Sequence, residues 1–431
     1  MNFKRRAISF ALISLLVSIN LPRQISAQEP AYDIVIRNGR VLDGAGNPWI
    51  LADVAIKDGR FVKIGKVEEK GKREIDATGK YVSPGFIDIH VHGGGGYDFM
   101  DGQETAFLRI AETHARYGTT SMLPTTLTST KEEMLHTLAV YEDANRNNIN
   151  GAQFLGMHLE GPYFAMDQRG AQDPRYIRDP DPEEYKEILS RSHSIKRWSV
   201  APELKGAIEL GRYLKSKNIL PSVAHTDAIY EEVLQAFENG YTLVTHLYSG
   251  MSGVTRRNAF RYAGVVESAF IIDEMDVEII ADGVHLPAPL LKLIYKIKGD
   301  DRTALITDAM RAAGTNVSES VLGNMENGLK VIIEDGVAKL PDRSAFAGSI
   351  ATADRLVRTM VHIADVPLLN AVKMITGTPA RILKVSDKKG ALAPGKDADI
   401  VIFDSNITIS MTMIKGRIVY DGNLIAGPIK V

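Results

Sequence analysis

Alternating hydrophobic and polar residues at both ends of the chain predict short β-strands joined by tight turns. Residues 32–39 end in Asn-Gly, and residues 53–59 end in Asp-Gly. An alternating stretch that closes on either dipeptide is typical of a β-hairpin. The same pattern returns at 399–404 and 413–422. We therefore expect strands from the two chain ends to pair in one small β-sandwich, with the rest of the chain inserted between them.

The middle of the chain alternates strand-like segments with helical segments. Eight such units over about 300 residues favour a (β/α)8 barrel of the TIM type, and a doubly wound parallel sheet is the alternative. Gly93–Gly96 lacks the Gly-x-Gly-x-x-Gly spacing of a dinucleotide-binding sheet. The predicted domains are a composite β-sandwich of residues 28–85 and 385–431 and a barrel of residues 86–384. The predicted strands are 85–92, 118–126, 151–160, 195–201, 219–226, 241–247, 277–282 and 303–308, and predicted helices include 104–117, 131–145 and 230–239.

The composition limits the chemistry that this chain can perform. Of its 431 residues, 45% are hydrophobic and 24% are charged, which supports a substantial core. Its 51 basic residues balance 53 acidic ones, and this argues against a dedicated nucleic-acid-binding protein. The sequence contains no cysteine, so disulfides, thiolate nucleophiles and iron–sulfur clusters are excluded. A catalytic metal would have to be held by His, Asp and Glu.

The first 27 residues have the features of a cleavable signal peptide. Three basic residues at 4–6 precede a largely apolar stretch at 7–19, and Ile25-Ser26-Ala27 forms a cleavage motif. An apolar stretch of about 13 residues is short for a membrane span, which needs about 20. We therefore expect the mature chain to be exported, periplasmic or secreted, with no stable membrane insertion.

A histidine pair at the end of the first predicted barrel strand supplies half of a candidate metal site. His90 and His92 are two residues apart, so in a strand their side chains face the same side. Active sites of barrels lie at the C-terminal ends of the strands. The glycines at 93–96 let the backbone turn tightly beside a ligand. The pair therefore predicts two imidazole ligands.

Four more polar residues end other predicted strands. Glu160 follows an apolar run, where a carboxylate is costly to bury without a cation. His225, His246 and Asp308 end three further strands. Because the strand ends of a barrel meet at one face, these residues and the histidine pair should converge there. The sequence predicts a centre for one or two divalent ions, with Zn²⁺ preferred and Fe²⁺, Co²⁺ and Mn²⁺ as alternatives.

Several segments resemble motifs of the amidohydrolase superfamily and, within it, of the N-acetylglucosamine-6-phosphate deacetylase family. The first-strand segment resembles the superfamily signature, and the others narrow the resemblance. They extend over about residues 32–422, in the order that the family has. The segments are Pro84–His92, His158–Tyr163, Thr245–Tyr248, Ala281–His285, Thr307–Met310, Ala347–Ser349 and Gly390–Asp399.

The resemblance implies a role for each candidate residue. Asp308 would be the catalytic acid and base, and Arg257 would bind a phosphate. The resemblance further implies a homodimer in which one subunit helps to complete its neighbour's site. The implied ligands are Glu160, His225 and His246 for the main metal and His90 and His92 for a second one. The implied substrate-binding residues are Gln172, Ser249, Gly250, Arg257 and His285.

Three segments depart from the family pattern, and all three correspond to parts of the family's site that lie around the substrate and not around the metal. Gln172 stands where the family usually has His, Ser249-Gly250 replaces Asn-Ala, and Asn258–Phe260 replaces Glu-Pro-Gly. Gln172 can still donate a hydrogen bond, but it cannot become cationic. We therefore expect the metal chemistry to be kept while the substrate contacts differ.

The function implied by the resemblance is hydrolysis of N-acetylglucosamine 6-phosphate to glucosamine 6-phosphate and acetate. Metal-activated water would attack the amide, with Asp308 as acid and base. The expected export favours a different substrate, another small acylated amine, because sugar phosphates are generally intracellular. The alternative is an exported deacylase of unphosphorylated N-acetyl sugars, N-acyl-D-amino acids or dipeptides. A third alternative is a non-catalytic metal-dependent binding protein.

Overall fold

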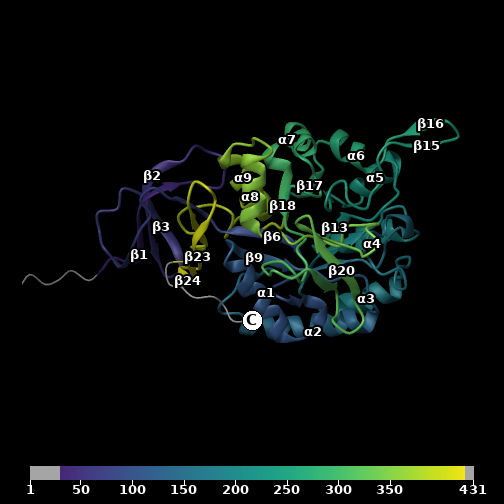
Figure 1. The fold of residues 1–431 in the computed structure, drawn as a ribbon, viewed down its shortest axis with the longest axis horizontal. Coiled ribbons are helices and arrows are strands. Elements are labelled where there is room, and N and C mark those ends of the chain that lie inside the picture. The colour runs from purple at the N-terminus through teal and green to yellow at the C-terminus, as the bar shows by residue number, and fades with distance from the viewer. Residues whose placement is uncertain (1–29, 423–431) are drawn as a thin grey trace, which may run out of the picture.

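Strands from both ends of the chain form one eight-stranded sheet. The computed structural model describes residues 30–422, so the predicted signal peptide lies outside the described residues. The strands are β1 (Tyr32–Val41), β2 (Ile50–Lys57), β3 (Arg60–Gly65), β4 (Gly71–Asp76), β5 (Tyr81–Pro84), β22 (Ile400–Phe403), β23 (Ile409–Ile414) and β24 (Arg417–Asp421). Their order is β24-β23-β22-β5-β1-β2-β3, with β4 paired to β1. The ends meet where β5 pairs antiparallel with β22, beside the barrel (Figure 1).

The turn predicted at Asn38-Gly39 is wrong. Strand β1 continues through these residues, and its pairing with β2 shifts between Ile36 and Gly39, which marks a β-bulge. Asn38 has a φ of 58°, a left-handed conformation that asparagine tolerates better than most residues. Because β1 pairs with β4 before the bulge and with β5 after it, the bulge redirects the strand between two partners. The Asp58-Gly59 turn, which joins β2 to β3, is confirmed.

The barrel has eight parallel strand positions, one of which is shared by the two short strands β10 and β11. Each position overlaps a predicted strand. They are β6 (Phe86–Val91), β9 (Thr119–Pro124), β10 with β11 (Gln153–Phe154 and Met157–Glu160), β12 (Ile195–Val200), β13 (Leu220–Val223), β14 (Leu243–Val244), β17 (Asp276–Ile280) and β18 (Thr303–Ile306). The pairing runs β10-β9-β6 and β11-β12-β13-β14-β17-β18. Bridges from Thr125 to His158 and from Val91 to Ala309 join the two arcs. The predicted (β/α)8 barrel is confirmed, and the doubly wound alternative is wrong.

Helices cover the outside of the barrel (Figure 1). Their apolar faces pack on the strands in one large core that includes Phe107, Tyr141 and Trp198. The helix that begins at Lys131 starts at a capping box between Thr130 and Glu133. The helices are α1 (Glu104–Ala115), α2 (Lys131–Asn147), α3 (Pro182–Arg191), α4 (Ala207–Ser216), α5 (Tyr230–Glu238), α6 (Val265–Ile271), α7 (Ala288–Arg302), α8 (Ala353–His362), α9 (Leu368–Ile375) and α10 (Gly377–Ile382).

Short strands in the connecting segments complete the fold. The pair β15 and β16 forms a hairpin that projects from the barrel (Figure 1). Within residues 30–422 we find no helix with both the length and the apolar character needed to span a membrane. The remaining elements are β7 (Gly93–Gly94), β8 (Tyr97–Asp98), β15 (Thr255–Arg257), β16 (Phe260–Tyr262), β19 (Glu319–Leu322), β20 (Leu329–Glu334), β21 (Val337–Lys339) and the 3₁₀ helices η1 (Phe99–Asp101) and η2 (Met166–Gln168).

Candidate metal centre

The candidate metal residues all lie at or just beyond the C-terminal ends of barrel strands. Glu160 is the last residue of β11, and His225, His246 and Asp308 each follow a strand by two residues. These three have φ values of 45°, 30° and 47°. A left-handed backbone is rare for residues other than glycine and costs about 1–3 kcal/mol. The tight exit from each strand therefore stores strain at the face where barrel enzymes place their active sites.

Glu160 lies at the centre of the cluster. Its Oε1 lies 3.0 Å from His246 Nε2, 3.3 Å from His90 Nε2 and 3.5 Å from His225 Nε2. Its Oε2 lies 3.4 Å from His92 Nε2. All five side chains are buried. The donor atoms form two groups that could each hold an ion, one of His90, His92 and Glu160 and the other of Glu160, His225 and His246.

The carboxylates of Glu160 and Asp308 stabilise positive charge at the histidine cluster. Asp308 Oδ1 lies 3.2 Å from His92 Nε2 and 3.4 Å from His90 Nε2. Burial lowers the pKa of both rings, but the two carboxylates more than offset it and raise the pKa of His90 to about 9 and that of His92 to about 10. For Glu160 the two effects have the opposite signs: burial raises the pKa of its carboxyl, but the surrounding imidazoles bring this pKa well below its ordinary value. A buried group of this kind fits a divalent cation.

Two histidines are oriented by backbone carbonyls in the way that metal ligands usually are. His225 Nδ1 lies 2.8 Å from the carbonyl oxygen of Gln168, and His92 Nδ1 lies 3.3 Å from that of Thr125. Because a carbonyl oxygen only accepts, each Nδ1 donates. Nε2 is then the nitrogen that faces Glu160, and it can bind a metal in place of its proton.

A cavity of about 250 Å³ opens at the cluster. The structure brings nearly all predicted site residues to it, and His90 lies buried beside it. His285 is held by a 2.8 Å hydrogen bond from its Nδ1 to Asp282 Oδ2. The predicted residues that line the cavity are His92, Glu160, Gln172, His225, His246, Ser249, Gly250, His285 and Asp308.

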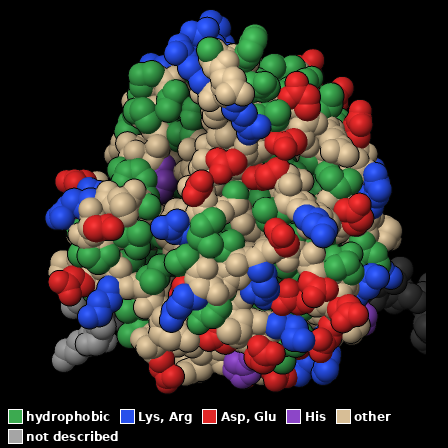
Figure 2. All heavy atoms as spheres, turned by 90° about the vertical axis from the view of Figure 1, so that its right-hand side faces the viewer, with side chains coloured by type: hydrophobic (Ala, Val, Ile, Leu, Met, Phe, Trp, Pro, Cys, Tyr) green, Lys and Arg blue, Asp and Glu red, His purple; other side chains and the backbone are tan. Residues whose placement is uncertain are grey.

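Arg257 is the predicted site residue that the structure does not bring to the cavity of its own chain. It ends β15 on the projecting hairpin and is exposed. Its guanidinium lies 5.6 Å from the ring centre of Tyr262 on the opposite strand. Exposed Arg256 and Arg261 share the hairpin, and basic side chains gather at the top of the face that Figure 2 shows. The hairpin thus presents positive charge away from the cavity.

Sequence reasoning missed the apolar walls of the cavity and the charges beneath it. Leu127, Leu322 and Phe346 line the cavity, but nothing in the hydrophobic pattern distinguishes them from core residues. Beneath the histidines, fully buried Arg197 donates to both carboxylate oxygens of Glu278. An arginine in the middle of the predicted barrel strand 195–201 is the sequence signal for this buried pair, because an unpaired buried charge is costly.

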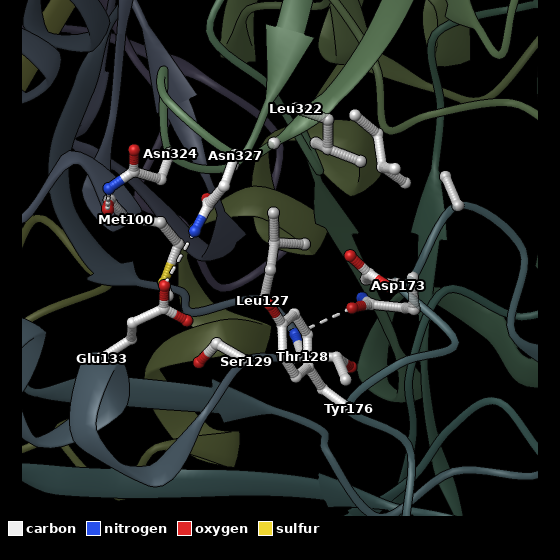
Figure 3. A pocket seen from close by; sticks show the side chains of 15 residues that line it. Met100, Leu127, Thr128, Ser129, Glu133, Asp173, Tyr176, Leu322, Asn324 and Asn327 are labelled. Atoms are coloured by element: carbon white, nitrogen blue, oxygen red, sulfur yellow. Dashed lines mark hydrogen bonds between the residues drawn. The ribbon is translucent and has the colours of Figure 1, made fainter.

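A second, smaller pocket adjoins the cavity. Figure 3 shows it, with Leu127, Leu322 and Tyr176 among the residues that line it. Gln172 lines both the pocket and the cavity. It is buried, with 6% of its surface exposed. Gln172 therefore forms part of the wall that separates the two.

Comparisons with known proteins agree with this site. The sequence profile of the amidohydrolase family matches residues 81–419. N-acetylglucosamine-6-phosphate deacetylase of Lysinibacillus sphaericus is 34% identical over 394 residues, which cover 89% of this chain and 97% of that protein. N-acetylgalactosamine-6-phosphate deacetylase of Escherichia coli is 33% identical over 336 residues, which cover 78% of this chain and 86% of that protein.

Solved structures show the same relationship. The crystal structure of N-acetyl-D-glucosamine-6-phosphate deacetylase from Mycobacterium smegmatis superposes with a TM-score of 0.82 at 29% identity, covering 90% of this chain and 100% of that one. The corresponding enzyme of Pasteurella multocida gives a TM-score of 0.83 at 27% identity, covering 89% and 99%. The chain therefore belongs to the amidohydrolase family, and it is a metal-dependent amidohydrolase.

Proposed function

We propose that this protein is an amino-sugar deacetylase that converts N-acetylglucosamine 6-phosphate to glucosamine 6-phosphate and acetate. The observation that carries the proposal is the convergence of Asp308 with Glu160 and four histidines beside one cavity. The relatives at 33–34% identity, named as deacetylases of acetylated hexosamine 6-phosphates, support the substrate class.

We assign the metal ligands from the two donor groups of the cluster. Glu160, His225 and His246 would hold the main ion, and His90 and His92 would serve a second one. The imidazole and carboxylate donors favour Zn²⁺, and Fe²⁺, Co²⁺ and Mn²⁺ accept the same set. The ion would supply a Lewis acid for the amide carbonyl and a lowered pKa for its water.

Asp308 is the proton carrier in this proposal. Burial raises the pKa of its carboxyl, but the nearby histidines bring it below the ordinary value, so the group is an ionised carboxylate near neutral pH and has an open position for a proton. It takes a proton from the water whose oxygen bonds to the acyl carbon. It then gives that proton to the amide nitrogen as the carbon–nitrogen bond breaks, which releases the amine and acetate. A 2.9 Å hydrogen bond from Asp308 N to His90 O holds the carrier in place.

We assign substrate contacts to Gln172, Ser249, Gly250 and His285, all of which line the cavity. We further propose a homodimer in which Arg257 binds the phosphate in the cavity of the other subunit. An exposed arginine on a projecting hairpin, outside its own cavity, supports this arrangement. Phosphate binding by arginine is strong because the guanidinium donates two parallel hydrogen bonds.

The second candidate is an exported deacylase of unphosphorylated N-acetyl sugars, N-acyl-D-amino acids or dipeptides. The signal-like features of residues 1–27 favour it, as does the uncharged Gln172 in the cavity wall. In this candidate the metal chemistry is kept and the phosphate contact is lost.

Amine release from paired substrates tests the proposal. The mature chain, loaded with metal, is assayed with N-acetylglucosamine 6-phosphate and with N-acetylglucosamine at equal concentrations, and the galactosamine pair is run in parallel. We expect kcat/KM to be at least tenfold higher for the phosphorylated sugars. Equal or reversed values would instead support the unphosphorylated alternative, and N-acyl-D-amino acids and dipeptides would be assayed next.

A further inference from the structure

We infer that Gln172 is a positioning residue that holds Glu160 as a one-oxygen ligand of the ion at His225 and His246. The inference rests on the proposed metal site but not on the proposed substrate. It concerns the hydrogen bonds on the side of Glu160 that faces away from His225 and His246.

The orientation of the Gln172 amide is determined by its two partners. The backbone N–H of Thr128 donates to Gln172 Oε1 at 2.9 Å, and the dashed line at Thr128 in Figure 3 marks this bond. A backbone N–H can only donate, so the end of the amide that faces it must be the oxygen. The NH₂ group then faces Glu160 and donates to its Oε2 at 2.6 Å.

This bond divides the two oxygens of Glu160 between two tasks. Oε1 has His246, His90 and His225 within 3.5 Å. Oε2 has Gln172 at 2.6 Å and His92 at 3.4 Å. A donor bound to Oε2 competes with any ion at His92 for that oxygen. Gln172 therefore favours tight binding of one ion by Oε1 and opposes an arrangement in which Glu160 bridges two ions.

The wall position of Gln172 makes the arrangement rigid. Its side chain is buried and lies between the cavity and the pocket of Figure 3. One end of the amide is anchored to the backbone of Thr128 and the other to the ligand. Groups that orient a metal ligand in this way typically change metal affinity 10–100-fold when they are removed.

Metal titration of the chelated full chain tests the inference without any substrate. The wild type is expected to bind a first Zn²⁺ much more tightly than a second. In Gln172→Met, which keeps the length but loses the donor, the first ion should bind about 10–100-fold more weakly. The ratio between the two dissociation constants should also shrink, because Oε2 becomes free to bridge. The visible spectrum of the Co²⁺-loaded variant should change with it.

Two further variants show whether the effect is specific. Gln153→Met makes the same substitution at a glutamine outside the cavity, whose side chain bonds Asp399, and its binding constants should equal those of the wild type. Gln172→His should also keep the wild-type binding constants. A neutral imidazole has one donor and one acceptor nitrogen bonded to the same carbon, just as the amide has a donor nitrogen and an acceptor oxygen on one carbon.

Unchanged constants in Gln172→Met would overturn the inference. Loss of the first ion in Gln172→His would also overturn it. This second result can be interpreted even if the methionine variant does not fold. Failure of the proposed deacetylase reaction would leave the titration unaffected, so the two claims are tested separately.

Discussion

The hydroxyl of Thr307 donates a hydrogen bond to the buried carboxylate of Asp88 and so joins the last barrel strand, β18, to the first, β6. The backbone N–H groups of Thr307 and His90 also donate to this carboxylate, each at 3.3 Å. His90 and Asp308 flank the connection, so the bond between the two strands sets the spacing of a proposed ligand and the proposed proton carrier.

Thr307→Val should lower the free energy of unfolding by about 1–3 kcal/mol, because the buried Asp88 carboxylate loses a donor. Thr303→Val is the matched control. Its hydroxyl is buried on the same strand and has no hydrogen-bond partner within the described part of the chain, so its removal should cost less than about 0.5 kcal/mol. Urea unfolding of both variants measures the difference, and equal losses would contradict a role for the Thr307–Asp88 bond.

The barrel and the convergence of its candidate metal ligands could be predicted because both follow from periodic features of the sequence. Alternation placed the strands, and the position of a polar residue at the end of an apolar run identified Glu160, His225, His246 and Asp308. Convergence then follows from barrel geometry alone. No contact between particular side chains had to be known.

Features that depend on tertiary partners could not be predicted in the same way. Asn38-Gly39 has the sequence of a hairpin turn, but pairing of β1 with two different strands makes it a bulge. The hydrogen bond from Gln172 to Glu160 depends on how a long loop folds back against Thr128. Leu322 at the end of β19 and Phe346 in the loop after β21 also reach the cavity, and the barrel pattern does not determine the position of this insertion.

Asp308→Asn should reduce kcat by about 10²–10⁴-fold and leave metal content unchanged. The amide keeps the shape of the side chain but cannot carry the proton between water and the departing amine. Asp308 belongs to neither of the two donor groups that could hold an ion within the described residues, so binding of the metal should not depend on it. Steady-state rates with metal analysis of the same sample check both parts, and near-normal turnover would refute the assignment.

Arg257→Ala should raise KM for N-acetylglucosamine 6-phosphate about tenfold or more, through loss of a charged hydrogen bond, with little effect on N-acetylglucosamine. The proposed dimer adds a sharper outcome. Mixed dimers of Arg257→Ala and Asp308→Asn subunits contain one complete site, because intact Asp308 in one subunit meets intact Arg257 from the other. Refolded together in equal amounts and assayed with N-acetylglucosamine 6-phosphate well below its KM, where Arg257→Ala alone has about a tenth or less of wild-type activity, the subunits should recover about a quarter of wild-type activity. Activity no higher than that of the separate variants would place Arg257 outside the neighbour's site.

Stability should fall on acidification because of His114, which lies buried in α1 with its Nε2 bonded to the carbonyl of Gly93 at 2.9 Å. Burial lowers the pKa of this ring below the ordinary value of 6.5. Between about pH 6.5 and the lower folded value, the unfolded chain binds a proton that the folded chain does not. The free energy of unfolding therefore decreases as pH falls through this window, by up to about 1.4 kcal/mol per pH unit.

His114→Gln removes the titration and keeps a donor for Gly93, so urea unfolding at pH 7.5 and 5.5 should show a smaller loss than in the wild type. Exposed His136 makes the same kind of bond, from its Nε2 to the carbonyl of Gly102 at 3.1 Å, and His136→Gln is the control that should leave the loss unchanged. If His114→Gln lost as much stability on acidification as the wild type, the buried ring would not be its source, and the other buried histidines would have to account for it.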